Sequence, residues 1–169
     1  MNTLPKLVIT DIDGVWTDGG MYYDQTGNEW KKFNTSDSAG VLFLRQLNIP
    51  LAIVTGENTE IVKRRAQKLK IDLVYSGISD KVKIALELCE KFNINLEEIA
   101  FIGDDLGDLP LLKKVGFACC PANASTYIKK HAHLVLDVKG GDGAFRAFIE
   151  YILDKNNVLE SCIEKATSF

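Results

Sequence analysis

Acidic side chains follow two of the apolar segments of the chain. Asp11 and Asp13 come after residues 7–10, and Asp104 comes directly after residues 99–103. Two carboxylates that converge repel each other unless a cation lies between them. Oxygen ligands without His or Cys suit Mg²⁺, which usually binds one or two carboxylates together with a substrate phosphate. The residue types therefore predict a magnesium site that includes Asp11 and Asp104.

A hydroxyl group and an ammonium group lie between these acidic pairs in the sequence. Thr55 ends another apolar segment and is followed by Gly56, and Lys81 stands near the start of an amphipathic stretch. Both groups are phosphate ligands by type. Ligands of open α/β sheets bind beyond the carboxyl ends of the strands, so these groups are expected to converge. Together they predict a phosphoryl-transfer site in which Asp11 attacks phosphorus.

Each of these motifs also has an ordinary structural explanation. Asp-x-Asp at a strand end often only caps a turn, Thr-Gly and Gly-Asp-Asp are common in turns and loops, and a lysine in a first helical turn is usually solvated. The functional interpretation is favoured because all four motifs fall at predicted strand ends or at a helix start.

Short apolar runs alternate with amphipathic stretches along the chain. This alternation predicts an α/β fold, a Rossmann-like parallel sheet sandwiched by helices within a single domain over residues 1–169. The expected strands cover 7–10, 51–55, 72–75, 99–103, 116–120 and 134–136. The expected helices cover 37–48, 58–70 and 80–92, with a further short helix in the tail 155–169.

Residues 20–33 break this pattern, because two aromatic runs flank the turn-forming segment 24–28. The segment predicts a projecting antiparallel hairpin, or flap. Its apolar side chains would leave an exposed patch in a monomer. They either fold back onto the core of their own chain or meet other subunits. The side chains concerned are Met21, Tyr22, Tyr23, Trp30 and Phe33.

The composition excludes several classes of function. The 169 residues carry 20 Lys and Arg against 23 Asp and Glu, a net charge of −3, which argues against nucleic acid or an anionic membrane as the main partner. The apolar runs are too short to cross a bilayer, and the first residues do not resemble a signal peptide. The four cysteines form no Cys-x-x-Cys. We therefore expect a reduced, cytoplasmic protein.

The four motifs together resemble the signature of the haloacid dehalogenase-like phosphatase superfamily. The matching segments are DIDGVWTDG at 11–19, VTG at 54–56, Lys81 and FIGDDLGD at 101–108. The chain is most similar to the cap-less branch that dephosphorylates 3-deoxy-2-keto sugar acids. The supporting features are DGxxYY and GxExKxF in the hairpin, TSDSAG at 35–40 and GGDGAFRAF at 140–148.

The resemblance implies a role for each carboxylate. Asp11 would be the nucleophile that forms an aspartyl-phosphate, and Asp13 would protonate the leaving oxygen and later activate water, a task worth about 10²–10⁴ in rate. Asp104 would bind Mg²⁺ together with Asp11 and the backbone carbonyl of Asp13. Asp105 and Asp108 would support the ion from outside its coordination shell.

The resemblance also implies the phosphate ligands and the absence of a cap. Thr55, Gly56 and Lys81 would hold the phosphoryl oxygens. The stretch from Asp11 to Thr55 is occupied by the hairpin and one helix, and the stretch from Lys81 to Asp104 by one helix and one strand, so neither holds a further domain. The hairpins of a homotetramer would then close each site.

Substrate selection is assigned by resemblance to Glu57, Arg65, Lys68 and Thr35. Arginine suits a substrate carboxylate by its bidentate geometry. The nononate-type relatives have Glu and Lys at the positions of Glu57 and Lys68, whereas the octulosonate enzymes typically have arginine in place of Glu57. This predicts 2-keto-3-deoxynononate 9-phosphate, or N-acylneuraminate 9-phosphate, as the substrate. The alternative is 3-deoxy-D-manno-octulosonate 8-phosphate.

Two questions stay open at the level of the sequence. The segment 140–143 either forms a turn before a helix or reaches a neighbouring active site, and Arg146 either binds substrate or anchors a salt bridge. Asp142 stands where the family pattern has arginine. A receiver-type signalling domain, which has similar residue types, is the non-enzyme alternative. The order of the motifs argues against it, because in a receiver the lysine comes last.

Overall fold

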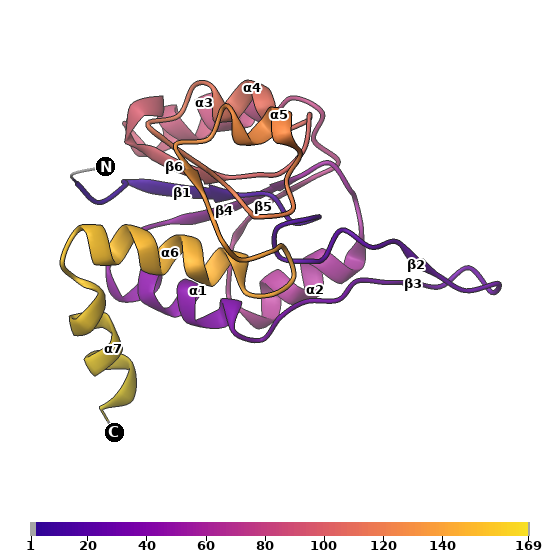
Figure 1. Cartoon of the computed structure of the whole chain (residues 1–169), viewed down its shortest axis with the longest axis horizontal. Coiled ribbons are helices and arrows are strands. Elements are labelled where there is room, and N and C mark those ends of the chain that lie inside the picture. The colour runs from indigo at the N-terminus through magenta and orange to yellow at the C-terminus, as the bar shows by residue number, and fades with distance from the viewer. Residues whose placement is uncertain (1–2, 169) are drawn as a thin grey trace.

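A parallel sheet of six strands forms the centre of the molecule (Figure 1). The coordinates are a computed structural model and describe residues 3–168. The strand order is β5-β4-β1-β6-β7-β8. The bounds are Leu7–Thr10 for β1, Leu51–Thr55 for β4, Leu73–Ser76 for β5, Ile99–Ile102 for β6, Phe117–Cys120 for β7 and Leu134–Val135 for β8. The predicted parallel α/β fold is confirmed.

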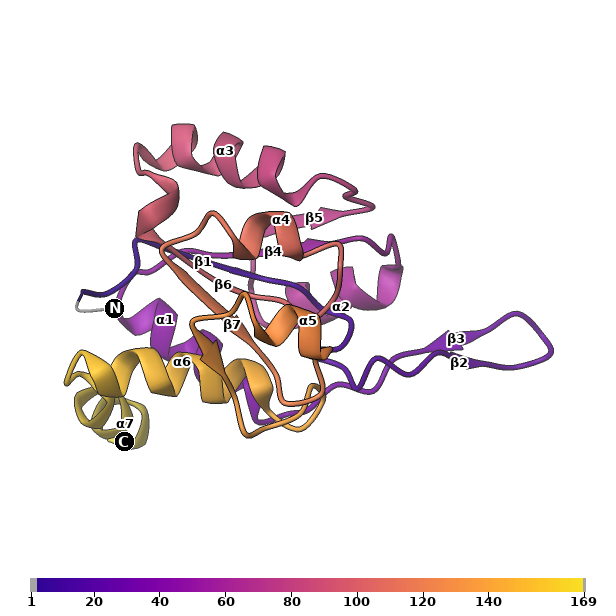
Figure 2. The same ribbon diagram turned by 45° about the horizontal axis from the view of Figure 1, so that its top comes forward.

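Helices cover both faces of this sheet, as Figures 1 and 2 show. One face carries α1 (Asp37–Gln46), α2 (Glu60–Lys68) and α6 (Ala144–Lys155), with α7 (Leu159–Thr167) beyond α6. The other carries α3 (Lys81–Phe92), α4 (Leu109–Leu112) and α5 (Thr126–Lys129), and the short 3₁₀ helix Leu96–Glu98 precedes β6. None of the helices within residues 3–168 combines the length and the apolar character that a membrane crossing requires.

Strand β1 lies between β4 and β6, so that all four of its residues are buried. Val8 pairs with Leu51 on one side and with Ala100 on the other. Successive side chains point to opposite faces, so Val8 packs into the α1 and α6 layer while Leu7 and Ile9 pack into the α3 and α4 layer. A strand enclosed in this way delivers whatever follows Thr10 to the middle of the carboxyl edge of the sheet.

The predicted bounds of β1 and β4 are exact, and those of the other predicted strands and of α1, α2 and α3 differ by at most two residues. The first two helices end before the predicted residues 48 and 70, because Asn48 and Lys70 adopt left-handed φ angles of 55° and 53°. Asn157, with a φ angle of 57°, separates α6 from α7. The four-residue helices α4 and α5 were not predicted, since one turn is too short to show a helical period.

The hairpin projects from the body of the protein (Figure 2). It consists of β2 (Tyr22–Tyr23) and β3 (Glu29–Trp30), with Tyr22 opposite Trp30. An isolated bridge between Thr17 and Phe33 closes its base. Met21, Tyr22, Tyr23 and Trp30 are exposed rather than folded back onto the core, whereas Phe33 is half-buried. The prediction of a projecting flap is confirmed.

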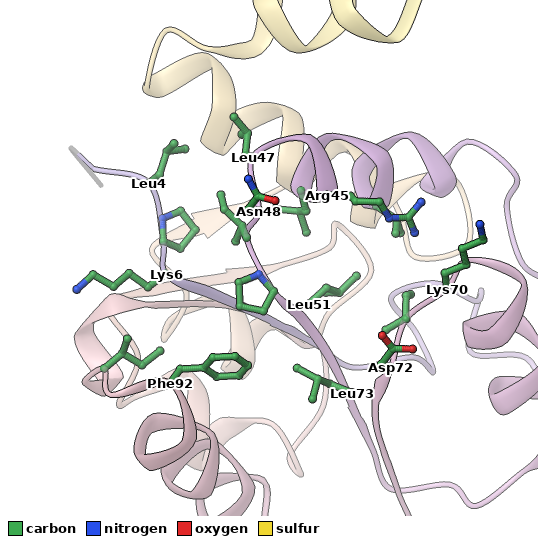
Figure 3. Close-up of a pocket in the computed structure, with 17 residues that line it drawn as sticks. Leu4, Lys6, Arg45, Leu47, Asn48, Leu51, Lys70, Asp72, Leu73 and Phe92 are labelled. Carbon is green, nitrogen blue, oxygen red and sulfur yellow. The ribbon is translucent and has the colours of Figure 1, made fainter.

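An apolar groove of about 810 Å³ lies at the amino edge of the sheet (Figure 3). The starts of β1, β4 and β5 and the ends of three helices line it. Leu51, Leu73 and Phe92 face its interior, and Lys6 and Lys70 lie at its rim with their ammonium groups directed outward. Apolar side chains thus dominate this edge.

Candidate functional site

The carboxyl edge of the sheet holds a smaller pocket of about 260 Å³. Its lining comes from the loops after β1, β4, β5 and β6. The predicted residues that line it are Asp11, Asp13, Thr55, Gly56, Glu57, Lys81, Asp105 and Asp108. Residues that are far apart in the sequence therefore converge, because parallel strands end at the same edge.

Gly14 makes the close approach of two of these loops possible. Its φ angle is 80°, in the left-handed region that favours glycine. A side chain at this position would collide with the carboxylate of Asp104. The turn after Asp13 therefore brings the first acidic motif directly against the second.

Three carboxylates form a cluster at this edge of the sheet, of which Asp11 and Asp108 line the pocket and Asp104 does not. Asp11, Asp104 and Asp108 each offer an oxygen, and these atoms lie within 4.8 Å of one another. Asp104 Oδ1 is buried and receives no hydrogen bond from the described residues. A cation would satisfy this oxygen and neutralise the cluster. Carboxylate oxygens alone suit Mg²⁺, so the residues present fit that ion.

The pKa values of Asp11 and Asp104 are both raised in this cluster. Burial, reinforced by the charge of Asp108, raises the pKa of Asp11 from 3.8 to about 7. Burial, followed by repulsion from Asp108 and Asp11, raises the pKa of Asp104 to about 8. Such shifts are typical of functional sites, because two neighbouring carboxylates resist ionising together.

Lys81 is the cation within this cluster. Its Nζ lies 2.6 Å from Asp108 Oδ1 and 2.8 Å from Asp11 Oδ1. Burial alone would lower the pKa of Lys81, but the two carboxylates outweigh it and raise the pKa. The ammonium group therefore stays charged, in a position where it can also hold a phosphoryl oxygen.

Asp108 organises the loop after β6 as well as the cluster. Its Oδ2 accepts hydrogen bonds from the backbone nitrogens of Asp104 (2.9 Å) and Asp105 (3.1 Å). The side chain is fully buried, whereas Asp105 is exposed at the pocket mouth. Asp108 thus contacts Lys81 and holds Asp104 in place, which makes it a more central member of the site than its sequence position indicated.

Three of the four predicted selectivity residues do not line this pocket. Glu57 does line the pocket, and it lies in the loop before α2. Lys68 is exposed near the end of α2, and Thr35 is exposed before α1. Arg65 donates a 3.0 Å hydrogen bond from Nη2 to the carbonyl of Asn34. Within one chain, therefore, only Glu57 of this set reaches the site.

Sequence reasoning missed Lys31, which the hairpin brings to the site. Its Nζ lies 2.6 Å from Asp13 Oδ1, and its side chain is only 2% exposed. Thr17 Oγ1 lies 3.4 Å from the same oxygen. The pattern GxExKxF at 27–33 included Lys31, but nothing in its local sequence indicates a contact with a residue so far back in the chain.

The glycine-rich segment 140–143 packs against the first acidic loop of its own chain. The backbone nitrogen of Gly141 donates a 3.1 Å hydrogen bond to the carbonyl of Val15, and a side chain at Gly140 would collide with the carbonyl of Gly14. Arg146 pairs with Glu150 at 2.7 Å. Within one chain, the segment thus forms a turn against Gly14, and Arg146 pairs with Glu150 on its own helix.

Asp37, at the start of α1, is another residue that sequence reasoning did not single out. It is fully buried, and its Oδ1 accepts a 2.9 Å hydrogen bond from the backbone nitrogen of Arg146. Burial raises its pKa to about 6. It lies outside the pocket and joins the starts of α1 and α6.

Comparisons with known proteins agree with this geometry. Residues 65–148 match the family of haloacid dehalogenase-like hydrolases. The 3-deoxy-D-manno-octulosonate 8-phosphate phosphatase KdsC of Yersinia pestis is 38% identical over 155 residues, which cover 92% of this chain and 83% of that protein.

Two solved structures of phosphatases have the same fold and also contain a metal. The Moraxella catarrhalis octulosonate phosphatase, in complex with magnesium, phosphate and KDO, superposes with a TM-score of 0.92 at 34% identity, over 96% of this chain and 94% of that one. The cobalt-bound enzyme of Haemophilus influenzae gives a TM-score of 0.87 at 35% identity, over 92% and 91%.

The level of identity, the coverage and the shared fold establish the family. The hairpin projects from the body of the protein, and most of the motif residues meet at the carboxyl edge of the sheet. This chain belongs to the cap-less sugar acid phosphatases of the haloacid dehalogenase-like superfamily and is a phosphoric monoester hydrolase.

Proposed function

We propose that the protein hydrolyses 3-deoxy-D-manno-octulosonate 8-phosphate in the presence of Mg²⁺. The observation that carries this proposal is the acidic pocket, whose cluster of Asp11, Asp104 and Asp108 calls for a cation. It is supported by relatives named for this activity, one of which holds magnesium, phosphate and KDO. The nononate 9-phosphate predicted from Glu57 and Lys68 becomes the second candidate, because these relatives are named for the eight-carbon acid.

The proposed reaction begins with attack by Asp11. Its carboxylate forms a bond to phosphorus while the bond from phosphorus to the sugar oxygen breaks, and the proton of Asp13 passes to that oxygen. Asp13 then takes a proton from the water that hydrolyses the aspartyl-phosphate. Thr55 and Lys81, both buried at the pocket wall, hold phosphoryl oxygens during the two steps.

The metal ligands in this proposal are the carboxylates of Asp11 and Asp104 and the backbone carbonyl of Asp13. Bound there, Mg²⁺ offsets the negative charge of the carboxylates and of the transferring phosphoryl group. Asp108 and Asp105 support the loop from outside, Asp108 through its hydrogen bonds to two backbone nitrogens of that loop. Gly56 follows Thr55 at the pocket wall, where its backbone can approach the phosphate.

A nononate 9-phosphate remains the second candidate substrate because of Glu57. This carboxylate lines the pocket mouth, where the octulosonate enzymes typically have arginine. The two candidates are separated by a Mg²⁺-dependent phosphate-release assay with both sugar acid phosphates. We expect the higher kcat/KM for the octulosonate, and the reverse order would favour the nononate.

A variant series sharpens this comparison. Glu57→Ala and Lys68→Ala should each lower kcat/KM for the preferred sugar acid, because a polar substrate group loses its partner. The loss should correspond to about 1–3 kcal/mol of transition-state stabilisation. Hydrolysis of p-nitrophenyl phosphate should barely change. Equal losses on both substrates would mean that these residues support the structure rather than choose the sugar.

The proposal includes a homotetramer whose hairpins close the sites. Met21, Tyr22, Tyr23 and Trp30 are exposed on one projecting flap, an arrangement that favours burial between subunits. Arg65, Thr35 and Lys68 lie outside the pocket of their own chain, so in this arrangement they would serve the site of a neighbour.

Light scattering tests the assembly directly. The protein should run at about four times 18.8 kDa, and Trp30→Glu should dissociate it and lower its activity, because a charge would be buried at the interface. A monomer with full activity would contradict this account.

The reaction is proposed to take place in the cytoplasm, a location supported by four cysteines that are all free and buried.

A further inference from the structure

Lys31 joins the hairpin to the proposed acid and base. Its Nζ lies 2.6 Å from Asp13 Oδ1 and 3.8 Å from Glu29 Oε1. We propose that Lys31 is a positioning residue, which holds the Asp13 carboxylate in the orientation needed for proton transfer to the leaving oxygen. The inference rests on the proposed phosphatase reaction and adds a function for the flap beyond covering the site.

The burial of the pair indicates a specific contact rather than a surface ion pair. The Lys31 side chain is 2% exposed and Asp13 is 28% exposed. An ammonium group loses several kcal/mol of hydration on burial and stays there only with a close partner. Lys32, the next residue, is 59% exposed and lies 3.9 Å from Asp18, which is typical of a weak surface pair. The chain thus buries one lysine of two at this place.

The two carboxylate oxygens of Asp13 have different surroundings. Oδ1 receives Lys31 at 2.6 Å and has Thr17 Oγ1 at 3.4 Å. Oδ2 is buried, yet among residues 3–168 it has no hydrogen-bond partner. Because Asp13 lines the 260 Å³ pocket, Oδ2 is the oxygen left for the substrate. Lys31 therefore determines which oxygen is engaged by the protein and which is available for the reaction.

The base of the hairpin links the position of Lys31 to the catalytic loop. The bridge between Thr17 and Phe33 fixes the strand two residues after Lys31. Thr17 Oγ1 also accepts hydrogen bonds of 3.3 Å from the backbone nitrogens of Gly14 and Gly19. The loop that carries Asp13 and the strand that carries Lys31 thus form one connected unit.

The test compares leaving groups, because protonation matters only when the leaving group is a poor one. A nitrophenolate departs without a proton, whereas the alkoxide of glycerol phosphate or of a sugar needs one. The value of kcat/KM reports steps up to departure of the leaving group, so it isolates this proton transfer from later hydrolysis of the aspartyl-phosphate. The variants are Lys31→Met, Lys31→Arg and the matched control Lys32→Met.

We expect Lys31→Met to lower kcat/KM about 10²-fold for the alkyl phosphates, the usual loss for a misplaced catalytic group. For p-nitrophenyl phosphate the loss should stay below about threefold, the leaving oxygen needing no proton. Lys31→Arg should recover part of the alkyl phosphate activity, and Lys32→Met should resemble the wild type on both. If Lys31→Met melts below the assay temperature, Lys31→Gln, which keeps an amide donor, replaces it.

Equal losses on both ester types would overturn the inference and assign Lys31 to folding or phosphate binding. A raised KM confined to the sugar acid, with unchanged kcat, would also overturn it, because Lys31 would then bind the substrate carboxylate. The proposed function fails in a different way. If the wild type hydrolyses glycerol phosphate but not the octulosonate phosphate, the substrate is wrong, and the leaving-group comparison still decides the role of Lys31.

Discussion

The two edges of the central sheet differ in the kind of space they enclose. The amino edge has a groove of about 810 Å³ lined mainly by aliphatic side chains, whereas the carboxyl edge has a pocket of about 260 Å³ that contains most of the predicted site residues. The larger cavity is therefore not the one that holds the candidate catalytic residues. Convergent charged groups at the ends of parallel strands locate the site better than volume does.

The charges at the two edges also differ in their burial. At the amino edge, Lys6 pairs with Glu98 in contact with solvent, a pair that contributes little to stability. At the carboxyl edge, Asp11 and Asp104 are held close together and largely buried, and their pKa values are raised to about 7 and 8. The repulsion between the carboxylates at the carboxyl edge favours the binding of a cation there. The amino edge contributes mainly apolar packing.

The largest expected effect is on kcat, when one carboxylate is neutralised at each edge of the sheet. Asp11→Asn should lower kcat by roughly 10⁴–10⁶, because it removes the attacking carboxylate and a metal ligand together. Asp72→Asn, the matched change at the rim of the amino-edge groove, should leave kcat unchanged. Steady-state phosphate release with both variants checks this. Substantial turnover by Asp11→Asn would contradict the proposed nucleophile.

The second expected effect is on stability, when an apolar side chain is truncated at the amino edge. Leu44, on α1, is buried and lines the amino-edge groove. Leu44→Ala should lower the free energy of unfolding by about 2–5 kcal/mol, since the cavity fills only in part. Urea unfolding measures the loss, and kcat well below the melting temperature should match the wild type. A large drop in kcat under those conditions would show that the two edges are coupled.

The smallest effect concerns Mg²⁺ and pH. The raised pKa values of Asp11 and Asp104 mean that the metal-free folded state retains protons up to about pH 7 and 8, which the unfolded chain releases near 3.8. The stability of the metal-free protein should therefore fall as the pH rises through this interval. Mg²⁺ competes with these protons, so it should raise Tm more at pH 8.5 than at pH 5.5.

Thermal melts with Mg²⁺ or EDTA at the two pH values measure this difference. At a Mg²⁺ concentration of 100 Kd the stabilisation at the higher pH should be about 2.7 kcal/mol. Asp104→Asn, which removes one of the ligands, should diminish it. A shift in Tm that is the same at both pH values would mean that the ion binds away from the carboxylate cluster.

Much of the fold and of the site could be read from local sequence. The β1 residues form a continuous apolar run because a central strand is buried on both faces, and Asp11 follows that run directly. The hairpin was recognisable from its aromatic runs and turn residues, which act over a few positions. Features of this kind are encoded where they occur, so the order of the motifs sufficed to predict one pocket at one edge.

Only the tertiary structure decided which distant side chains share that pocket. Lys31 contacts Asp13 because the second strand of the hairpin returns to the sheet next to the loop after β1. Asp108 contacts Lys81 because the loop after β6 turns toward the start of α3. Glu57 reaches the pocket although Lys68, which the sequence grouped with it, does not. Contacts like these depend on loop paths and burial, which no local pattern records. The sequence by itself thus determined the chemistry that is available, and the packing of the loops determined which groups meet to perform it.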